Sequence, residues 1–170
     1  MNFIIQFIGA IGYTTLTLSY FKKEKKNILF MQIIAYIFFT IHYYLLSGIT
    51  GAICNALGLV ALLTIYLSDK KNWKNKELLS YIFMVFIFII NIVTFQNIYS
   101  IYPIIASILA IFSFLLNDEN HIRGIGLICA VCWLIYAIAY KSYIAIAFEV
   151  ITLIGTIAAF IKNNGQKVKI

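Results

Sequence analysis

The sequence predicts an all-α integral membrane protein of about seven transmembrane helices, because of its composition, its charge spacing and an internal repeat. Of its 170 residues, 63% are hydrophobic and 11% are charged, whereas roughly a quarter are charged in an ordinary soluble domain. The charges fall in short runs, which leaves uncharged stretches of about 17–21 residues, the length that a helix needs to cross the hydrocarbon core. No strand-like alternation is visible, so the spans are predicted to be helices, which satisfy their own backbone groups in lipid.

The first apolar stretch, residues 3–20, is predicted to be a retained span and not a signal peptide. No basic residue precedes it, and Lys22, Lys23, Lys25 and Lys26 follow it, which is the reverse of a secretory signal. The other spans are delimited by charged or turn-forming residues. The seven predicted spans are 3–20, 28–46, 48–68, 79–95, 100–116, 122–140 and 143–161.

The loops between these spans alternate in charge. Every basic residue except Lys141 falls in a loop or tail on one side of the predicted bundle. Because basic loops face the cytoplasm, this pattern predicts an amino terminus outside and a carboxy terminus inside. The net charge of +7 therefore indicates orientation, and no nucleic-acid partner is expected. The basic segments are 22–26, 69–77, 117–123 and 162–169, and the nearly uncharged ones are 47, 96–99 and 141–142.

An internal repeat relates the first three spans to the last three at an offset of roughly 94 positions. At this offset Gly48 meets Ser142 and Asn55 meets Glu149, although few residues are identical. A single middle span restores the direction of the second triplet, so the two repeats are predicted to be parallel. This 3+1+3 plan is similar to that of the sugar facilitators known as SWEETs. The predicted parts are a first repeat (1–68), a cytoplasmic loop with an inverting linker helix (69–98), and a second repeat with a short cytoplasmic tail (99–170).

Glu149 is the one carboxylate inside an apolar segment, and an ionisable group there is a candidate for function. Thr152 shares its predicted helix face, and together they form a polar stripe that suits a solute site. The alternative is a protonated or snorkelling carboxyl that only holds helices together. Asn55 is its counterpart in the first repeat, where an amide can bind a polar solute, hold Glu149 in place or bond a neighbouring helix.

His42 and Tyr136 also coincide in the repeat, near the outer ends of their spans. We include both in the candidate binding set, and we favour anchoring or gate-packing over proton transfer because such residues are common near membrane interfaces. Pro103 and the pair Gly9 and Gly12 occupy matching regions of the two repeats, where they are predicted to act as hinges.

No nucleotide-binding loop, metal-ligand motif or catalytic triad is present, and the loops are too short to build one. Cys129 and Cys132 have a Cys-x-x-Cys spacing, but they lie in mid-span without a neighbouring group to activate a thiol, so packing explains them better. The sequence therefore predicts a protein that is not an enzyme and has no cofactor and no metal.

Several landmarks together resemble the YgjV family of bacterial inner-membrane proteins over nearly the whole chain. They are Gln6-x-x-Gly9, His42-x-x-Leu45-Leu46, Gly51-Ala52-x-x-Asn55, Pro103, Cys132-Trp133 and Glu149. The resemblance implies a multi-pass protein of the bacterial plasma membrane, similar in plan to the SWEET and PQ-loop superfamily. The Pro-Gln pair of the PQ-loop branch is missing, and Gly58 stands where the family pattern has an Arg.

These features predict a facilitator or carrier of a small polar solute, which works by alternating access around a site between Asn55 and Glu149. The alternative is a membrane receptor or assembly protein with the same fold and no transport activity. The expected partners are the lipid bilayer and the solute, and association into a homo-oligomer stays open. The sequence does not identify the solute.

Overall fold

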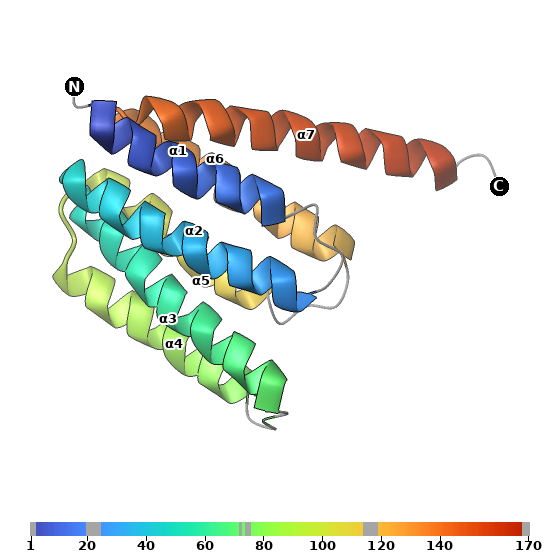
Figure 1. The fold of residues 1–170 in the computed structure, drawn as a ribbon, viewed down its shortest axis with the longest axis horizontal. Helices are drawn as coiled ribbons and strands as arrows, with labels where there is room; N and C mark the ends of the chain where they lie inside the picture. The colour runs from blue at the N-terminus through green and yellow to red at the C-terminus, as the bar shows by residue number, and fades with distance from the viewer. Residues whose placement is uncertain (1–2, 20–24, 72, 74–75, 114–118, 168–170) are drawn as a thin grey trace.

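The computed structural model describes residues 3–19, 25–71, 73, 76–113 and 119–167. These residues form seven α-helices and one short 3-10 turn, which confirms the predicted all-α class (Figure 1). The helices are α1 (Phe3–Ser19), α2 (Lys25–Leu45), α3 (Ile49–Lys71), α4 (Lys76–Val93), α5 (Ile101–Ser113), α6 (Glu119–Ala139) and α7 (Tyr143–Lys167), and the 3-10 turn η1 (Ile98–Ser100) precedes α5.

Several helices extend beyond the predicted apolar spans. The α3 helix continues through Asp69 to Lys71, and α7 continues to Lys167, into segments predicted to be loop and tail. A helix satisfies its backbone hydrogen bonds internally, so it does not have to end where the apolar sequence ends. Two segments, Lys26–Leu45 and Ile49–Ser68, are long and apolar enough by themselves to cross a membrane, and the remaining apolar helices within the described ranges are 10–17 residues long.

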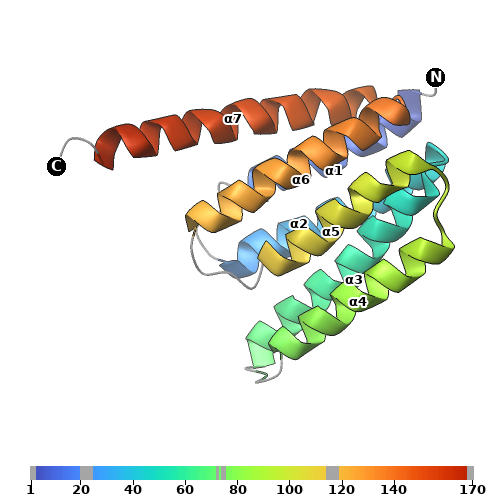
Figure 2. The ribbon, with the colours of Figure 1, turned by 180° about the vertical axis from the view of Figure 1, so that it is seen from behind.

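Successive helices run in opposite directions, so the connections gather at two ends of the bundle (Figures 1 and 2). One end carries the start of α1, the turns at Ser47 and Lys141, and η1, and we call it the turn end. The other end carries Lys70 and Lys71 in the last turn of α3 and Trp73 just after it, and we call it the basic end. There Lys71 Nζ lies 5.8 Å from the centre of the Trp73 ring.

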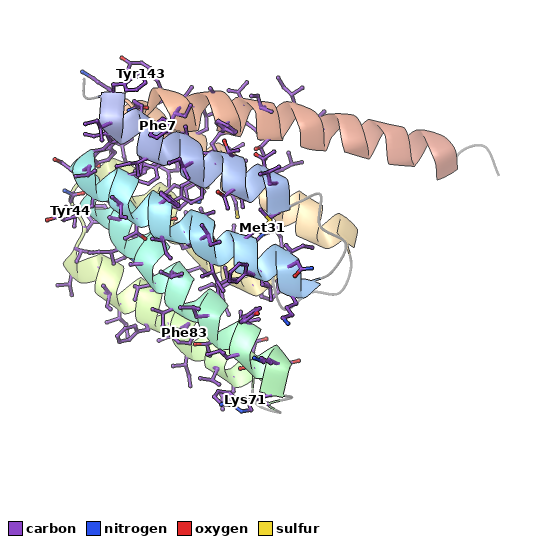
Figure 3. All side chains as sticks on the ribbon, viewed as in Figure 1. Phe7, Met31, Tyr44, Lys71, Phe83 and Tyr143 are labelled. Carbon is purple, nitrogen blue, oxygen red and sulfur yellow. The ribbon has the colours of Figure 1, made fainter. Side chains whose placement is uncertain are left out.

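The helices pack as a ring of six with α4 on its outside. The α1 helix contacts α2 and α7, the α3 helix contacts α2 and α5, and the α6 helix contacts α5 and α7, while α4 packs against α3 and α5. Large apolar side chains cover the outer surface, and Phe7, Tyr44 and Tyr143 project outward at the turn end (Figure 3). Such a surface is costly in water but suits lipid.

The turns after α2 and α6 have the same backbone geometry at a spacing of 94 residues. Ser47 and Lys141 both adopt positive φ, 60° and 53°, which is uncommon for residues other than glycine. The Gly48 amide donates to the Tyr43 carbonyl at 2.9 Å, and Ser142 donates to Ala137 at the same distance. Each turn is thus a Schellman motif that ends one helix and starts the next within three residues.

Helix boundaries recur at the same spacing. The α2 helix ends at Leu45 and α6 at Ala139. Ser19 and Ser113 even make the same bond, since each hydroxyl donates to the carbonyl three residues earlier, at 2.6 and 2.7 Å. These local features recur at the offset of 94 residues, and the division of the chain into two repeats stays a prediction.

Candidate functional site

The structure buries four of the five predicted binding residues and brings them into two separate clusters. Thr152 is half-buried, one turn after Glu149 on α7. One cluster surrounds Glu149 inside the bundle, and the other lies at the turn end. The exposed fractions of the buried four are 0% for His42, 3% for Asn55, 0% for Tyr136 and 8% for Glu149.

The first cluster, here called the Glu149 cluster, consists of Tyr13, Tyr43 and Glu149, from α1, α2 and α7. The Tyr13 hydroxyl donates to Glu149 Oε1 at 3.3 Å. The Tyr43 side chain is 1% exposed and lies near both Tyr13 and Glu149. Its buried hydroxyl lies close to the Tyr13 hydroxyl but has no partner with hydrogen-bond geometry within the part of the chain that the structure describes. Three helices thus place three oxygen-bearing side chains together, and one of them lacks a partner.

Aromatic rings enclose this cluster. The Tyr13 ring lies 4.6 Å from the Phe39 ring and 5.1 Å from the Phe148 ring, measured between ring centres. The Tyr43 ring lies 5.4 Å from Trp133 and 5.3 Å from Tyr136. Rings on two sides keep water away from the carboxyl, so its hydrogen bonds are made in an apolar environment.

Asn55 does not contact Glu149 through a hydrogen bond within the described ranges. Its Nδ2 donates to the Gly51 carbonyl at 2.8 Å, one turn earlier on the same helix. The amide oxygen keeps capacity to accept further bonds. Binding by Asn55 therefore stays a prediction, whereas the tyrosines beside Glu149 are contacts that the sequence analysis missed. Tyr13 is one tyrosine within an apolar helix, so the sequence gives no signal for its role. Its contact with Glu149 becomes visible only in the structure.

The second cluster joins the two repeats at the turn end. His42 Nδ1 donates to the Ile5 carbonyl at 2.8 Å, and its Nε2 lies 2.7 Å from Ser142 Oγ. Because a carbonyl only accepts, the neutral ring carries its proton on Nδ1 and accepts from Ser142 at Nε2. Tyr136 Oη accepts from the Gly51 amide at 2.9 Å. We call the His42–Ser142 and Tyr136–Gly51 bonds the reciprocal latch.

Two of the latch residues coincide in the repeat. His42 and Tyr136 are 94 positions apart. His42 on α2 bonds Ser142 just before α7, and Tyr136 on α6 bonds Gly51 in the first turn of α3. Both side chains are fully buried, so they pack inside the bundle and do not project to the lipid headgroups. This environment does not suit anchoring at the headgroups, and gate-packing stays a prediction.

Further polar bonds at the turn end were not predicted. Thr50 Oγ1 lies 2.9 Å from Ser100 Oγ, between α3 and η1. The corresponding positions between α7 and α1 are Ile144 and Gln6. There the Ile144 amide donates to Gln6 Oε1 at 3.1 Å. The 94-residue offset pairs Thr50 with Ile144 and Gln6 with Ser100. The 94-residue offset is the sequence signal from which these contacts could have been predicted.

The predicted hinge residues lie at close helix contacts. A Cβ on Gly9 would lie 2.8 Å from His42 Cε1, and one on Gly12 would lie 2.8 Å from Phe39 Cε1. Pro103 is buried in the first turn of α5, where its missing amide donor costs little. Close packing alone explains the two glycines, and a hinge role at the three positions stays a prediction.

Comparison with known proteins identifies one family. The family model Imp-YgjV, described as a bacterial inner membrane protein, matches residues 3–167. No curated protein and no solved structure matches the chain. The matched range runs from the first residue of α1 to the last residue of α7, so it includes both clusters.

Proposed function

The chain belongs to the Imp-YgjV family of bacterial inner membrane proteins, and we propose that it carries a small polar solute across that membrane by alternating access. The observation that carries the proposal is the Glu149 cluster, a carboxyl enclosed by helices α1, α2 and α7. An ionisable group inside a membrane bundle is costly and marks a functional site by default. In this proposal the chain is a carrier and not an enzyme.

The recurrence of local structure at 94 residues supports a 3+1+3 plan similar to that of the SWEETs. Helices α1 to α3 would form one unit, α5 to α7 the other, and α4 would link them. The two interfaces α1–α7 and α3–α5 are then equivalent under the repeat. Glu149 contacts Tyr13 across the first of these interfaces. Solute sites of repeat-built carriers lie between the repeats, where rocking of one unit exposes them to each side in turn.

The reciprocal latch supports a specific state in this cycle. Its two bonds tie each unit to the turn of the other at the turn end. We assign the turn end to the outer face because exposed Lys70 and Lys71 mark the opposite end as cytoplasmic. The structure then corresponds to a carrier that is closed on the outside, and opening requires both latch bonds to break.

Uptake into proteoliposomes tests the proposal. Wild type would be screened with sugars, nucleosides, amino acids and amines, beside Glu149→Gln, Asn55→Ala and the control Glu77→Gln. Glu77 is an exposed carboxylate in the first turn of α4, so its substitution makes the same chemical change outside the bundle. We expect uptake of at least one solute class, about a tenfold loss or more in Glu149→Gln, as for removal of one charged contact, and unchanged uptake in Glu77→Gln.

A different result would favour the alternative function. If wild type transports nothing and no solute of the panel raises its thermal stability, the carrier proposal fails. The buried polar residues would then be structural, as in a membrane receptor or assembly protein of the same fold.

A further inference from the structure

Glu149 has no cationic partner among the buried residues that the structure describes. It is the only carboxylate among the buried residues that the structure describes, and none of these residues is a lysine or an arginine. A buried carboxylate without a partner is unfavourable, and the missing positive charge has to come from a proton or a bound group. The neighbours of Glu149 decide what kind of group fits.

The neighbouring oxygens leave hydrogen-bonding capacity unused. The 3.3 Å bond from Tyr13 to Glu149 is longer than the usual 2.5–3.0 Å for hydroxyl donors, so the carboxylate can still accept shorter bonds from another donor. The Tyr43 hydroxyl has no partner among the described residues, although its side chain is almost completely buried. Both hydroxyls can accept as well as donate. The cluster therefore offers three acceptors from three helices: one carboxylate and two phenol oxygens.

We propose that the Glu149 cluster binds a primary ammonium group of the solute. A primary ammonium has three N–H donors, as many as the acceptors that Tyr13, Tyr43 and Glu149 present. On binding, the Tyr13 hydroxyl gives up its bond to Glu149 and accepts from the ammonium. This inference rests on the proposed carrier function, since it names the chemistry of the solute.

Other occupants fit the cluster less well. A metal ion needs more oxygen, nitrogen or sulfur ligands than this, and the described residues contain no group of three or more His, Cys, Asp or Glu side chains that could hold one. An anion would be repelled by the carboxylate. A quaternary ammonium carries the positive charge but has no N–H to give the three oxygens. A proton alone would neutralise Glu149 but would supply one new donor, fewer than the three of a primary ammonium.

Binding of small probes to the purified protein in detergent tests this inference separately from transport. The probes are n-butylammonium, tetramethylammonium, n-butanol and butyrate, which differ in charge and in N–H donors but are similar in size. We expect only n-butylammonium to raise the Tm saturably. Glu149→Gln should abolish this shift, Tyr43→Phe should weaken the apparent Kd about tenfold, as for loss of one charge-assisted bond, and Glu77→Gln should behave as wild type.

The inference is overturned if none of the probes stabilises wild type, if tetramethylammonium matches n-butylammonium, or if Glu149→Gln keeps the n-butylammonium shift. The comparison of probes on wild type stands even if a variant fails to fold. Uptake of a neutral solute without any amine binding would leave the carrier proposal intact and remove only the ammonium site. Amine binding without uptake of any solute would support the ammonium site and remove the carrier proposal.

Discussion

His42 on α2 and Tyr136 on α6 lie 94 positions apart, and each bonds a residue that follows the helix of the other. His42 Nε2 lies 2.7 Å from Ser142 Oγ, and Tyr136 Oη accepts from the Gly51 amide at 2.9 Å. The chemistry of the two bonds differs, since one joins two side chains and the other satisfies a backbone amide in the first turn of a helix. His42 and Tyr136 coincide at the 94-residue offset, whereas their partners Ser142 and Gly51 do not, so the two bonds can be tested separately by mutation.

The His42–Ser142 bond should contribute a measurable coupling energy. We expect a double-mutant cycle of His42→Ala and Ser142→Ala to give about 0.5–2 kcal/mol in the free energy of unfolding, the range for polar contacts between membrane helices. The measurement is reversible unfolding in mixed micelles. A control cycle of His42→Ala with exposed Thr17→Ala should be additive. Additivity in the His42–Ser142 cycle as well would show that the bond contributes nothing.

Gly51 should tolerate no side chain. A Cβ there would lie 2.4 Å from Tyr136 Cε1, so the ring would have to move and the bond from the Gly51 amide would break. We expect Gly51→Ala to lower the free energy of unfolding by about 1–3 kcal/mol, the usual cost of overpacking. Gly124→Ala is the matched control on α6, because nothing lies within 4 Å of its added Cβ, and alanine there should be neutral or stabilising. Equal effects of the two substitutions would contradict the close contact.

Two tyrosine-to-phenylalanine changes in the Glu149 cluster should have opposite effects on stability. Tyr43→Phe removes a buried hydroxyl without a partner in the described structure, so stability should stay constant or rise by up to about 1 kcal/mol. Tyr13→Phe removes the donor to Glu149 and should lower stability by about 1 kcal/mol. Unfolding in mixed micelles without added amine measures both. A loss in Tyr43→Phe as large as in Tyr13→Phe would show that the Tyr43 hydroxyl has a partner.

The two ends of the bundle should face opposite sides of the membrane. Lys141 is exposed at the turn end and Lys71 at the basic end. With the turn end outside, a membrane-impermeant maleimide should label Lys141→Cys in intact spheroplasts and label Lys71→Cys only after permeabilisation. The unmodified chain, with its free Cys54, Cys129 and Cys132, provides the background. The opposite labelling pattern would invert the proposed orientation.

Much of the fold could be predicted from the sequence, because the features concerned are local. Long uncharged stretches predicted the helices, and charged or turn-forming residues predicted where they connect. The offset of 94 was visible from landmarks such as Gly48 and Ser142, and the turns at Ser47 and Lys141 share their geometry because each depends on a few consecutive residues. The place of Glu149 within an apolar segment was also visible in the sequence, but a snorkelling carboxyl stayed open there.

The partners of the buried polar groups were decided only by the tertiary structure. The sequence pointed to a site between Asn55 and Glu149, yet Asn55 bonds its own helix and Glu149 bonds Tyr13, 136 positions away. Hydropathy cannot predict such pairs when a helix is apolar on every side, because it does not reveal how the helix is rotated about its axis. That rotation follows from close contacts such as Gly9 against His42 and Gly51 against Tyr136, which exist only once all the helices have packed together.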